Sequence, residues 1–195
     1  MRAPGDVPVY VGSPNTLDTH APPPTDGTFI HGPLGLGGAD MPRPPLPPPH
    51  PETIGVSAAE FIAREARARR GELVLSVFSP LTNVAIALLL EPDLPSLVAE
   101  VHVMGGAFEF GGNVGPLAEA NFASDATAAK IVVDAFSAGP RCPLSGRPRL
   151  KLCVTAPELL LLRCARAWYH ATSPTAATIA TTATLLPLTD KQTTN

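Results

Sequence analysis

The chain has 195 residues and a net charge of −3, with 24 prolines and 16 glycines. Its length suits one domain of ordinary size, whereas the proline and glycine content indicates low-complexity segments within it. The weak negative charge excludes the basic surface of a nucleic-acid-binding protein, and no apolar run is long enough to span a bilayer. We therefore expect neither a nucleic-acid nor a membrane partner.

The three cysteines do not indicate a disulfide framework or a zinc site. Cys142, Cys153 and Cys164 are odd in number and lack paired spacing. The first residues contain no continuous apolar run of the kind found in a secretory signal. The sequence therefore predicts reduced thiols and a cytoplasmic location.

The first expected element is a strand over residues 7–11, VPVYV. A long irregular region follows, and its Pro-rich loop, residues 41–51, favours an extended polyproline-like chain. A helix is expected over residues 57–70, because its first four residues, SAAE, match a capping box. Gly71 would end this helix.

Strands and helices then alternate along the chain. Apolar patterns predict strands over residues 72–78 and 100–104, and helices over residues 81–90 and 124–136, with Ser124 or Asp125 capping the last helix. This alternation predicts an α/β fold with a mainly parallel open sheet and flanking helices, of the Rossmann-like kind.

The pattern changes after residue 136. Residues 137–151 show no period, and the chain ends in a Thr/Ala-rich segment, although residues 157–168 could form a helix between them. The sequence therefore predicts an α/β domain over residues 1–136, which includes the Pro-rich loop, and an irregular, low-complexity tail over residues 137–195.

Two polar loops follow the two predicted strands, and parallel strands end at the same edge of a sheet. One loop is SPLTN, residues 79–83, and the other lies within MGGAFEFGGNVGPLAEAN, residues 104–121. In the second loop, Asn113, Glu119 and Asn121 supply the donors and acceptors that a polyhydroxylated ligand needs. Because the glycines match no phosphate-binding pattern, a sugar is favoured over a nucleotide phosphate. Alternatively, this loop only turns the chain.

Two histidines require separate interpretations. His31 lies in a glycine-dense loop, FIHGPLGLGG, which could be a lid over a site or simply an exposed loop. His102 lies in the predicted strand over residues 100–104, where a sheet residue with satisfied hydrogen bonds is expected.

Three segments together resemble the calcium-dependent inosine–uridine preferring nucleoside hydrolases. Residues 30–42, IHGPLGLGGADMP, are similar to the active-site loop of that family, and residues 79–83 are similar to its Gly-Pro-Leu-Thr-Asn strand end. Residues 104–121 are similar to its Met-Gly-Gly segment, and Ala120 resembles the plant-type, uridine-preferring branch. The match is in register over about residues 7–136.

The resemblance implies an enzyme that cleaves the N-glycosidic bond of a ribonucleoside to give the free base and ribose. It implies ribose binding by Asn113, Glu119 and Asn121, with Met104 lining the sugar pocket. It also implies a calcium ion that is coordinated by the backbone carbonyl of Thr82. His31 would lie on the lid over the site. A homo-oligomer is possible.

Two expected motifs of the family are missing from the chain. The Asp-x-Asp-x-x-x-Asp-Asp motif, which supplies the general base and most calcium carboxylates in the family, is absent, and so is a later His-Asp pair. One carbonyl is too few for the six to eight oxygens that calcium takes. The sequence therefore predicts an incomplete, truncated form of the fold that is inactive or impaired as an isolated chain.

A different class of function is also open. Residues 42–51 contain Pro-x-x-Pro spacings that suit an aromatic-lined groove. The alternative is therefore a non-catalytic interaction protein that uses this segment.

Overall fold

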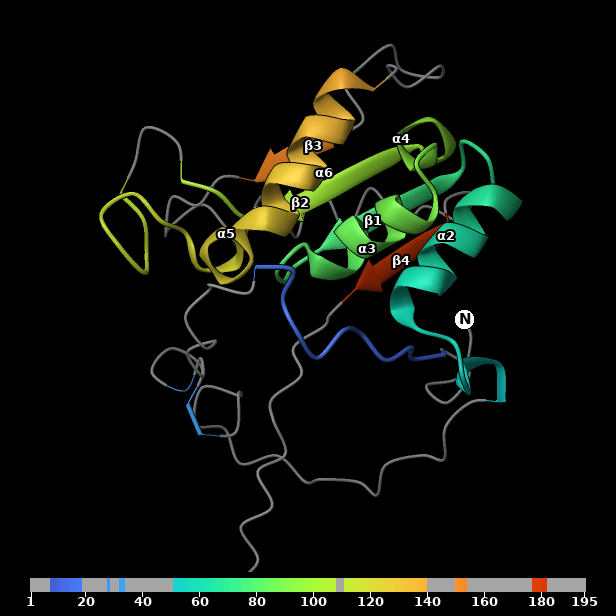
Figure 1. Ribbon diagram of the computed structural model, residues 1–195, viewed down its shortest axis with the longest axis horizontal. Helices are drawn as coiled ribbons and strands as arrows, with labels where there is room; N and C mark the ends of the chain where they lie inside the picture. The colour runs from blue at the N-terminus through green and yellow to red at the C-terminus, as the bar shows by residue number, and fades with distance from the viewer. Residues whose placement is uncertain are drawn as a thin grey trace, which may run out of the picture.

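The computed structural model describes residues 8–18, 28, 32–33, 51–107, 111–139, 150–153 and 177–181. Within them, four strands form one sheet in the order β3-β2-β1-β4, and every neighbouring pair is parallel (Figure 1). The strands are β1 (Leu73–Val77), β2 (Glu100–Met104), β3 (Leu150–Cys153) and β4 (Ala177–Thr181). The predicted α/β fold with a parallel sheet is confirmed.

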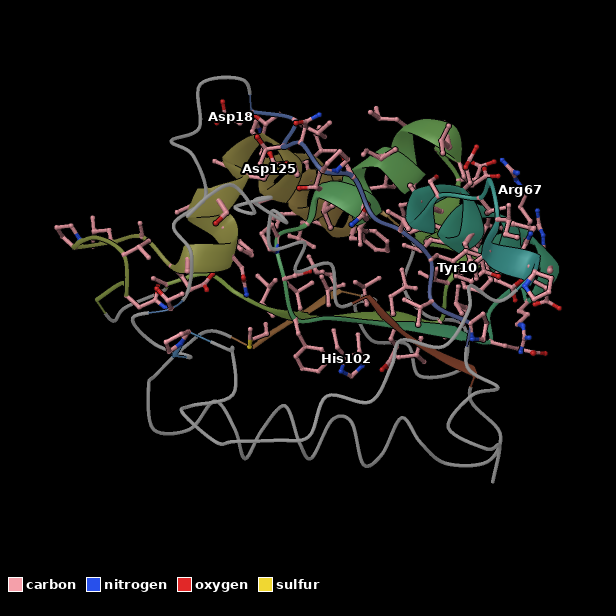
Figure 2. The ribbon with its side chains drawn as sticks, turned by 90° about the horizontal axis from the view of Figure 1, so that it is seen from below. Tyr10, Asp18, Arg67, His102 and Asp125 are labelled. Atoms are coloured by element: carbon pink, nitrogen blue, oxygen red, sulfur yellow. The ribbon has the colours of Figure 1, made fainter. Side chains whose placement is uncertain are left out.

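The described helices are η1 (Pro51–Thr53), α2 (Ala58–Ala68), α3 (Thr82–Leu90), α4 (Leu94–Leu97), α5 (Ala120–Ser124) and α6 (Ala126–Ala138). The α-helices among them lie on one face of the sheet, as Figure 2 shows. In the middle of this layer, α3 packs against both α2 and α6. The bounds of α2, α3 and α6, and of the central strands β1 and β2, lie within two or three residues of the predicted ones.

Helix α2 begins with the predicted capping box. The hydroxyl of Ser57 accepts a hydrogen bond from the Glu60 amide at 3.2 Å, and the Glu60 carboxylate accepts one from the Ser57 amide at 2.8 Å. The Ser57 hydroxyl also donates to this carboxylate at 2.7 Å, and the bonds from the Ser57 amide and hydroxyl hold the pKa of Glu60 below its usual value. Beyond the helix, Gly71 adopts a φ of 76°, and its amide donates to the carbonyl of Leu97 at 2.7 Å.

The core lies between β1, β2 and the helix layer. All five residues of β1 are buried, as expected for a central strand of a parallel sheet. Ile62 of α2, Leu75 of β1, Val101 of β2 and Val132 of α6 are fully buried and belong to one hydrophobic cluster. Complete burial of such a side chain stabilises the fold by about 1.5–3 kcal/mol.

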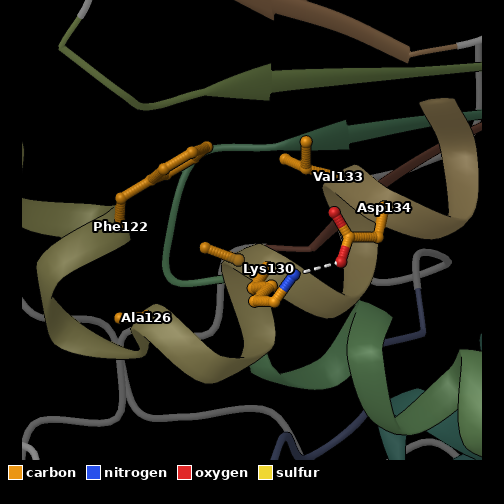
Figure 3. A pocket seen from close by; sticks show the side chains of 6 residues that line it. Phe122, Ala126, Lys130, Val133 and Asp134 are labelled. Carbon is orange, nitrogen blue, oxygen red and sulfur yellow. Dashed lines mark hydrogen bonds and ion pairs between the residues drawn. The ribbon is translucent and has the colours of Figure 1, made fainter.

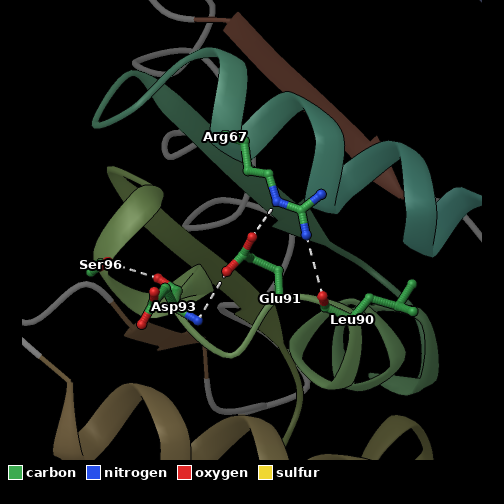
Figure 4. Close-up of polar contacts among 5 residues, drawn as sticks. All are labelled: Arg67, Leu90, Glu91, Asp93 and Ser96. Carbon is green, nitrogen blue, oxygen red and sulfur yellow. Dashed lines mark hydrogen bonds and ion pairs between the residues drawn. The ribbon is translucent and has the colours of Figure 1, made fainter.

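Polar contacts join α2 to the connection between α3 and α4 (Figure 4). The Arg67 guanidinium pairs with the Glu91 carboxylate and also donates to the carbonyl of Leu90 at 3.3 Å. This pairing is the main reason why the pKa of Glu91 is lowered. The Ser96 hydroxyl donates to the carbonyl of Asp93 at 2.8 Å in the first turn of α4.

The predicted strand over residues 7–11 is not part of the sheet. Within the described residues 8–11, one isolated bridge joins Val11 to Ser57. The ring of Tyr10 stacks on the ring of Phe61 with centroids 3.8 Å apart, so this segment runs along α2 instead. Of the apolar residues that predicted a strand, Tyr10 contacts the helix, whereas Val9 and Val11 are exposed.

The structure also differs from the predicted tail. Two segments after residue 136 form sheet strands, since β3 pairs with β2 and β4 pairs with β1. The Thr/Ala composition suggested low complexity, yet the β-branched residues in β4 suit a strand. The predicted helix over residues 157–168 lies outside the described residues, and the domain boundary at residue 136 stays a prediction.

None of the helices in the described part of the chain is long and apolar enough to cross a membrane.

Candidate functional site

The ends of β1 and β2 lie side by side, as the sequence predicted. Val77 pairs with Val103 in a parallel ladder, so the segments that follow both strands leave the sheet at the same edge. The first segment leads into α3 and the second into the glycine-rich loop before α5 (Figure 1).

On the sheet face away from the helices, the His102 ring pairs with the Glu100 carboxylate at 2.8 Å (Figure 2). This contact confirms the interpretation of His102 as a sheet residue with satisfied hydrogen bonds.

The glycines after β2 are required by close contacts. A Cβ at Gly105 would lie 2.7 Å from the ring of Phe122, and Gly106 adopts a φ of 87°. A Cβ at Gly112 would lie 2.0 Å from the backbone oxygen of Ala118. These contacts exclude larger residues, so the glycines allow the loop to fold back tightly on itself.

Glu119 is the buried centre of this loop. Its Oε1 accepts a hydrogen bond from the amide of Asn121 at 2.9 Å. Its Oε2 accepts bonds from the amides of Phe122 and Gly106, at 3.1 and 3.0 Å. Only 3% of the residue is exposed, and hydrogen bonds to a charged acceptor are about twice as strong as neutral ones. The carboxylate therefore fastens the end of β2 to the start of α5.

The two asparagines are also tied to the backbone. The Oδ1 atom of Asn113 accepts from the amide of Ala120 at 2.8 Å, and the Nδ2 atom of Asn121 donates to the carbonyl of Met104 at 2.9 Å. Four of the predicted site residues are thus brought into one bonded cluster: Met104, Asn113, Glu119 and Asn121. Their roles in ribose binding stay predictions.

This cluster keeps hydrogen-bonding capacity for a ligand. An ionised carboxylate has about four acceptor positions, and three backbone amides use three of those of Glu119. Within the described residues, no hydrogen bond engages the amide nitrogen of Asn113 or the amide oxygen of Asn121. The cluster can therefore offer a donor and two acceptors to neighbouring hydroxyl groups. The alternative, that this loop only turns the chain, accounts for the hydrogen bonds between the side chains of Asn113, Glu119 and Asn121 and the backbone.

A shallow hollow of about 330 Å³ lies beside this cluster, on α6 (Figure 3). It is lined by Phe122, Ala126, Ala129, Lys130, Val133 and Asp134. Its wall is mainly apolar and includes none of the predicted site residues, so the hollow is separate from the polar cluster.

Thr82 lies at the start of α3, at the neighbouring strand end. Its hydroxyl donates to the Oδ2 atom of Asp125 at 2.6 Å, and both residues are buried. In an α-helix the carbonyl of the first residue accepts from the amide four residues later, so one lone pair of the Thr82 carbonyl is directed into the helix. The other lone pair is the one that a cation would use.

The described residues do not fit a calcium ion. None of them form a group of three or more His, Cys, Asp or Glu side chains able to hold a metal. The two buried carboxylates near the strand ends, Glu119 and Asp125, each already accept three hydrogen bonds. Among the described groups, the Thr82 carbonyl is the one predicted calcium ligand, and calcium needs six to eight oxygens.

Two predicted functional segments cannot be placed. His31, and with it most of the lid loop, lies outside the described residues, as does the Pro-rich loop up to residue 50. The structure describes Gly32, whose φ is 73° and whose amide donates to the carbonyl of Thr28 at 2.8 Å. The lid role of His31 and the use of residues 42–51 in an interaction both stay predictions.

Sequence reasoning missed the importance of two residues. Phe122 covers Gly105, and the Asp125 carboxylate contacts two distant parts of the chain. Asp125 is one of the two predicted caps of α6, and its bond from the Ala128 amide at 3.0 Å confirms that role. Its distant partners could not be found from local sequence.

Comparisons with known proteins agree with this fold. The model of the inosine-uridine preferring nucleoside hydrolase family matches residues 1–189. A probable uridine nucleosidase 1 from Oryza sativa subsp. japonica is 38% identical over 159 residues, which are 81% of this chain and 46% of the rice protein. Uridine nucleosidase 1 from Arabidopsis thaliana is 39% identical over 127 residues, which are 65% of this chain and 36% of that protein.

A solved structure supports the same relationship. A plant nucleoside hydrolase superimposes with a TM-score of 0.57 and 29% sequence identity, covering 67% of this chain and 39% of that one. The chain thus spans less than half the length of these relatives. Because the family model matches nearly the whole sequence, the chain belongs to the inosine-uridine preferring nucleoside hydrolase family.

Proposed function

We propose that this chain acts on ribonucleosides as part of an N-ribohydrolase, with uridine as the preferred substrate. In the reaction, water adds to the anomeric carbon of ribose while the bond to the base nitrogen breaks, which gives ribose and the free base. The observation that carries the proposal is the cluster around Glu119, which gathers polar groups at a strand end in a family of nucleoside hydrolases. The preference for uridine rests on the names of the plant relatives.

The chemistry assigned to this cluster is the binding of ribose. Asn113, Glu119 and Asn121 bind the sugar hydroxyls, and Met104 lines the sugar pocket. Breaking the glycosidic bond places positive charge on the ribose ring, as in other glycoside cleavages. Hydrogen bonds that tighten as this charge develops lower the barrier, because they are stronger in the transition state than in the ground state.

Calcium is implied by the resemblance, and the Thr82 carbonyl is its proposed ligand here. Since the described residues do not fit that ion, we assign no catalytic step to it. We also propose that the isolated chain turns over slowly, because the two buried carboxylates described near the strand ends, Glu119 and Asp125, each already accept three hydrogen bonds.

Base release tests the proposed activity directly. The chain is incubated with uridine or inosine, with and without added calcium, and the free uracil or hypoxanthine is measured by chromatography. Slow release above the uncatalysed rate supports the proposal, and Asn121→Ala should abolish it. Release no faster than in buffer, together with no binding of uridine, contradicts it. Rapid turnover would instead contradict the proposed impairment.

Two further proposals concern the cell rather than the site. The sequence predicts a cytoplasmic location, and a homo-oligomer is a separate proposal. Fractionation and sedimentation of the intact chain would test them.

A further inference from the structure

The buried carboxylate of Asp125 connects three separate segments of the chain. Its Oδ1 atom accepts from the amide of Ala128 at 3.0 Å, which caps α6. Its Oδ2 atom accepts from the hydroxyl of Thr82 at 2.6 Å and from the amide of Leu17 at 2.8 Å. Asp125 is completely buried, so water does not compete for these bonds. One side chain therefore fixes the starts of α3 and α6 to the N-terminal segment (Figure 2).

A second buried side chain attaches the same segment to the same strand end. The Oδ1 atom of Asn83 accepts from the amide of Ser13 at 2.8 Å. Only 4% of Asn83 is exposed. Residues 13–17 are thus held at two points over the beginning of α3, with Asn83 at one point and Asp125 at the other.

The position of Asp125 relates these contacts to the polar cluster. It directly follows α5, the helix that begins with Ala120 and Asn121 and is capped by Glu119. A shift of Asp125 would therefore move the start of α6 and the end of α5 together. It would also release Thr82 and Leu17, which lie at the neighbouring strand end and in the segment that precedes the His31 loop.

We propose that Asp125 is a positioning residue of the ribose site, which holds Thr82 and residues 13–17 in a fixed relation to the polar cluster. This inference rests on the proposed function, since it assigns a role in the same site. Asp125 itself does not contact the substrate. A carboxylate is required at this position because its three partners are all donors, whereas an asparagine would direct an N–H group at one of them.

The test combines a binding measurement with amide exchange in the full chain. Asp125→Asn keeps the size of the side chain, and Asp134→Asn is the control, because Asp134 is an exposed carboxylate on the same helix. Uridine affinity is measured by calorimetry, and hydrogen exchange of the Leu17 amide is followed by mass spectrometry. We expect Asp125→Asn to speed Leu17 exchange and to weaken uridine binding, each by roughly tenfold. Asp134→Asn should change neither.

A second pair of variants covers the case in which Asp125→Asn does not fold. Thr82→Ser keeps the hydroxyl that donates to Asp125, and Thr82→Val removes it. Positioning through this bond predicts that the valine variant binds uridine roughly tenfold more weakly than the serine variant. Equal affinities for these two variants would overturn the inference.

The remaining outcomes separate the inference from the proposed function. Faster Leu17 exchange with unchanged uridine affinity in Asp125→Asn would show a purely structural role and overturn the positioning role alone. An unaltered chain that binds no uridine would refute the proposed function, and the positioning role would fall with it.

Discussion

Replacing Glu119 with glutamine tests whether its buried carboxylate holds the glycine-rich loop. The unaltered side chain accepts three backbone hydrogen bonds, from Asn121, Phe122 and Gly106. In Glu119→Gln, the amide oxygen can replace the Oε2 atom and keep two of them. The amide nitrogen would then face the amide of Asn121, so a donor would meet a donor.

The expected cost follows from the number and kind of these bonds. A hydrogen bond to a charged group contributes about 1.5–3 kcal/mol, and a neutral one about 0.5–1.5 kcal/mol. Glu119→Gln loses one charged bond and converts two others to neutral ones, although it also removes the cost of burying a charge. We expect the free energy of unfolding to fall by about 2–4 kcal/mol.

Urea denaturation measures this loss, and amide exchange localises it. Glu72→Gln is the matched control, because Glu72 is an exposed carboxylate, and it should change stability by less than about 0.5 kcal/mol. The amides of Gly106, Asn121 and Phe122 should exchange faster in Glu119→Gln. If stability matched the control and these amides kept their protection, the fastening role of Glu119 would be refuted.

Three further changes probe the loop and the first long helix. Gly112→Ala should destabilise the chain by about 1–3 kcal/mol in thermal unfolding, because its Cβ would meet the backbone of Ala118; unchanged stability would contradict the tight loop geometry. Asn121→Asp removes the donor to the carbonyl at the end of β2 and should weaken uridine binding in calorimetry, whereas equal affinity would count against the cluster. The lowered pKa of Glu60 predicts a stability contribution that is present above its usual value of 4.5 and lost as the pH falls through the folded-state pKa. Urea midpoints across this acid range should therefore fall less for Glu60→Gln than for the unaltered chain. Identical pH profiles would refute the capping box with Ser57 as the source of this stability contribution.

Local signals in the sequence predicted much of the helix and strand order. The capping box marked the start of α2, and uniform apolarity marked β1 as a buried strand, because both patterns depend on neighbouring residues. The convergence of two polar loops also followed from local order, since parallel strands end at one edge of a sheet.

Contacts between distant residues explain what the sequence could not predict. Tyr10 stacks on Phe61 rather than entering the sheet, so an apolar pattern typical of a strand was misleading. Asp125 bonds to Leu17 across 108 positions and to Thr82 across 43, and nothing in its own neighbourhood indicates these partners. Likewise, a Thr/Ala-rich segment forms β4 because it pairs with the buried strand β1.

Titration of the intact chain with uridine tests the central claim most directly. The claim is that the cluster around Glu119 recognises ribose through Asn113 and Asn121. Calorimetry should show saturable binding of uridine and of ribose, lost in the double variant Asn113→Ala/Asn121→Ala and kept in Glu72→Gln. Binding that is absent from the unaltered chain, or equal in the double variant and the control, would contradict the account.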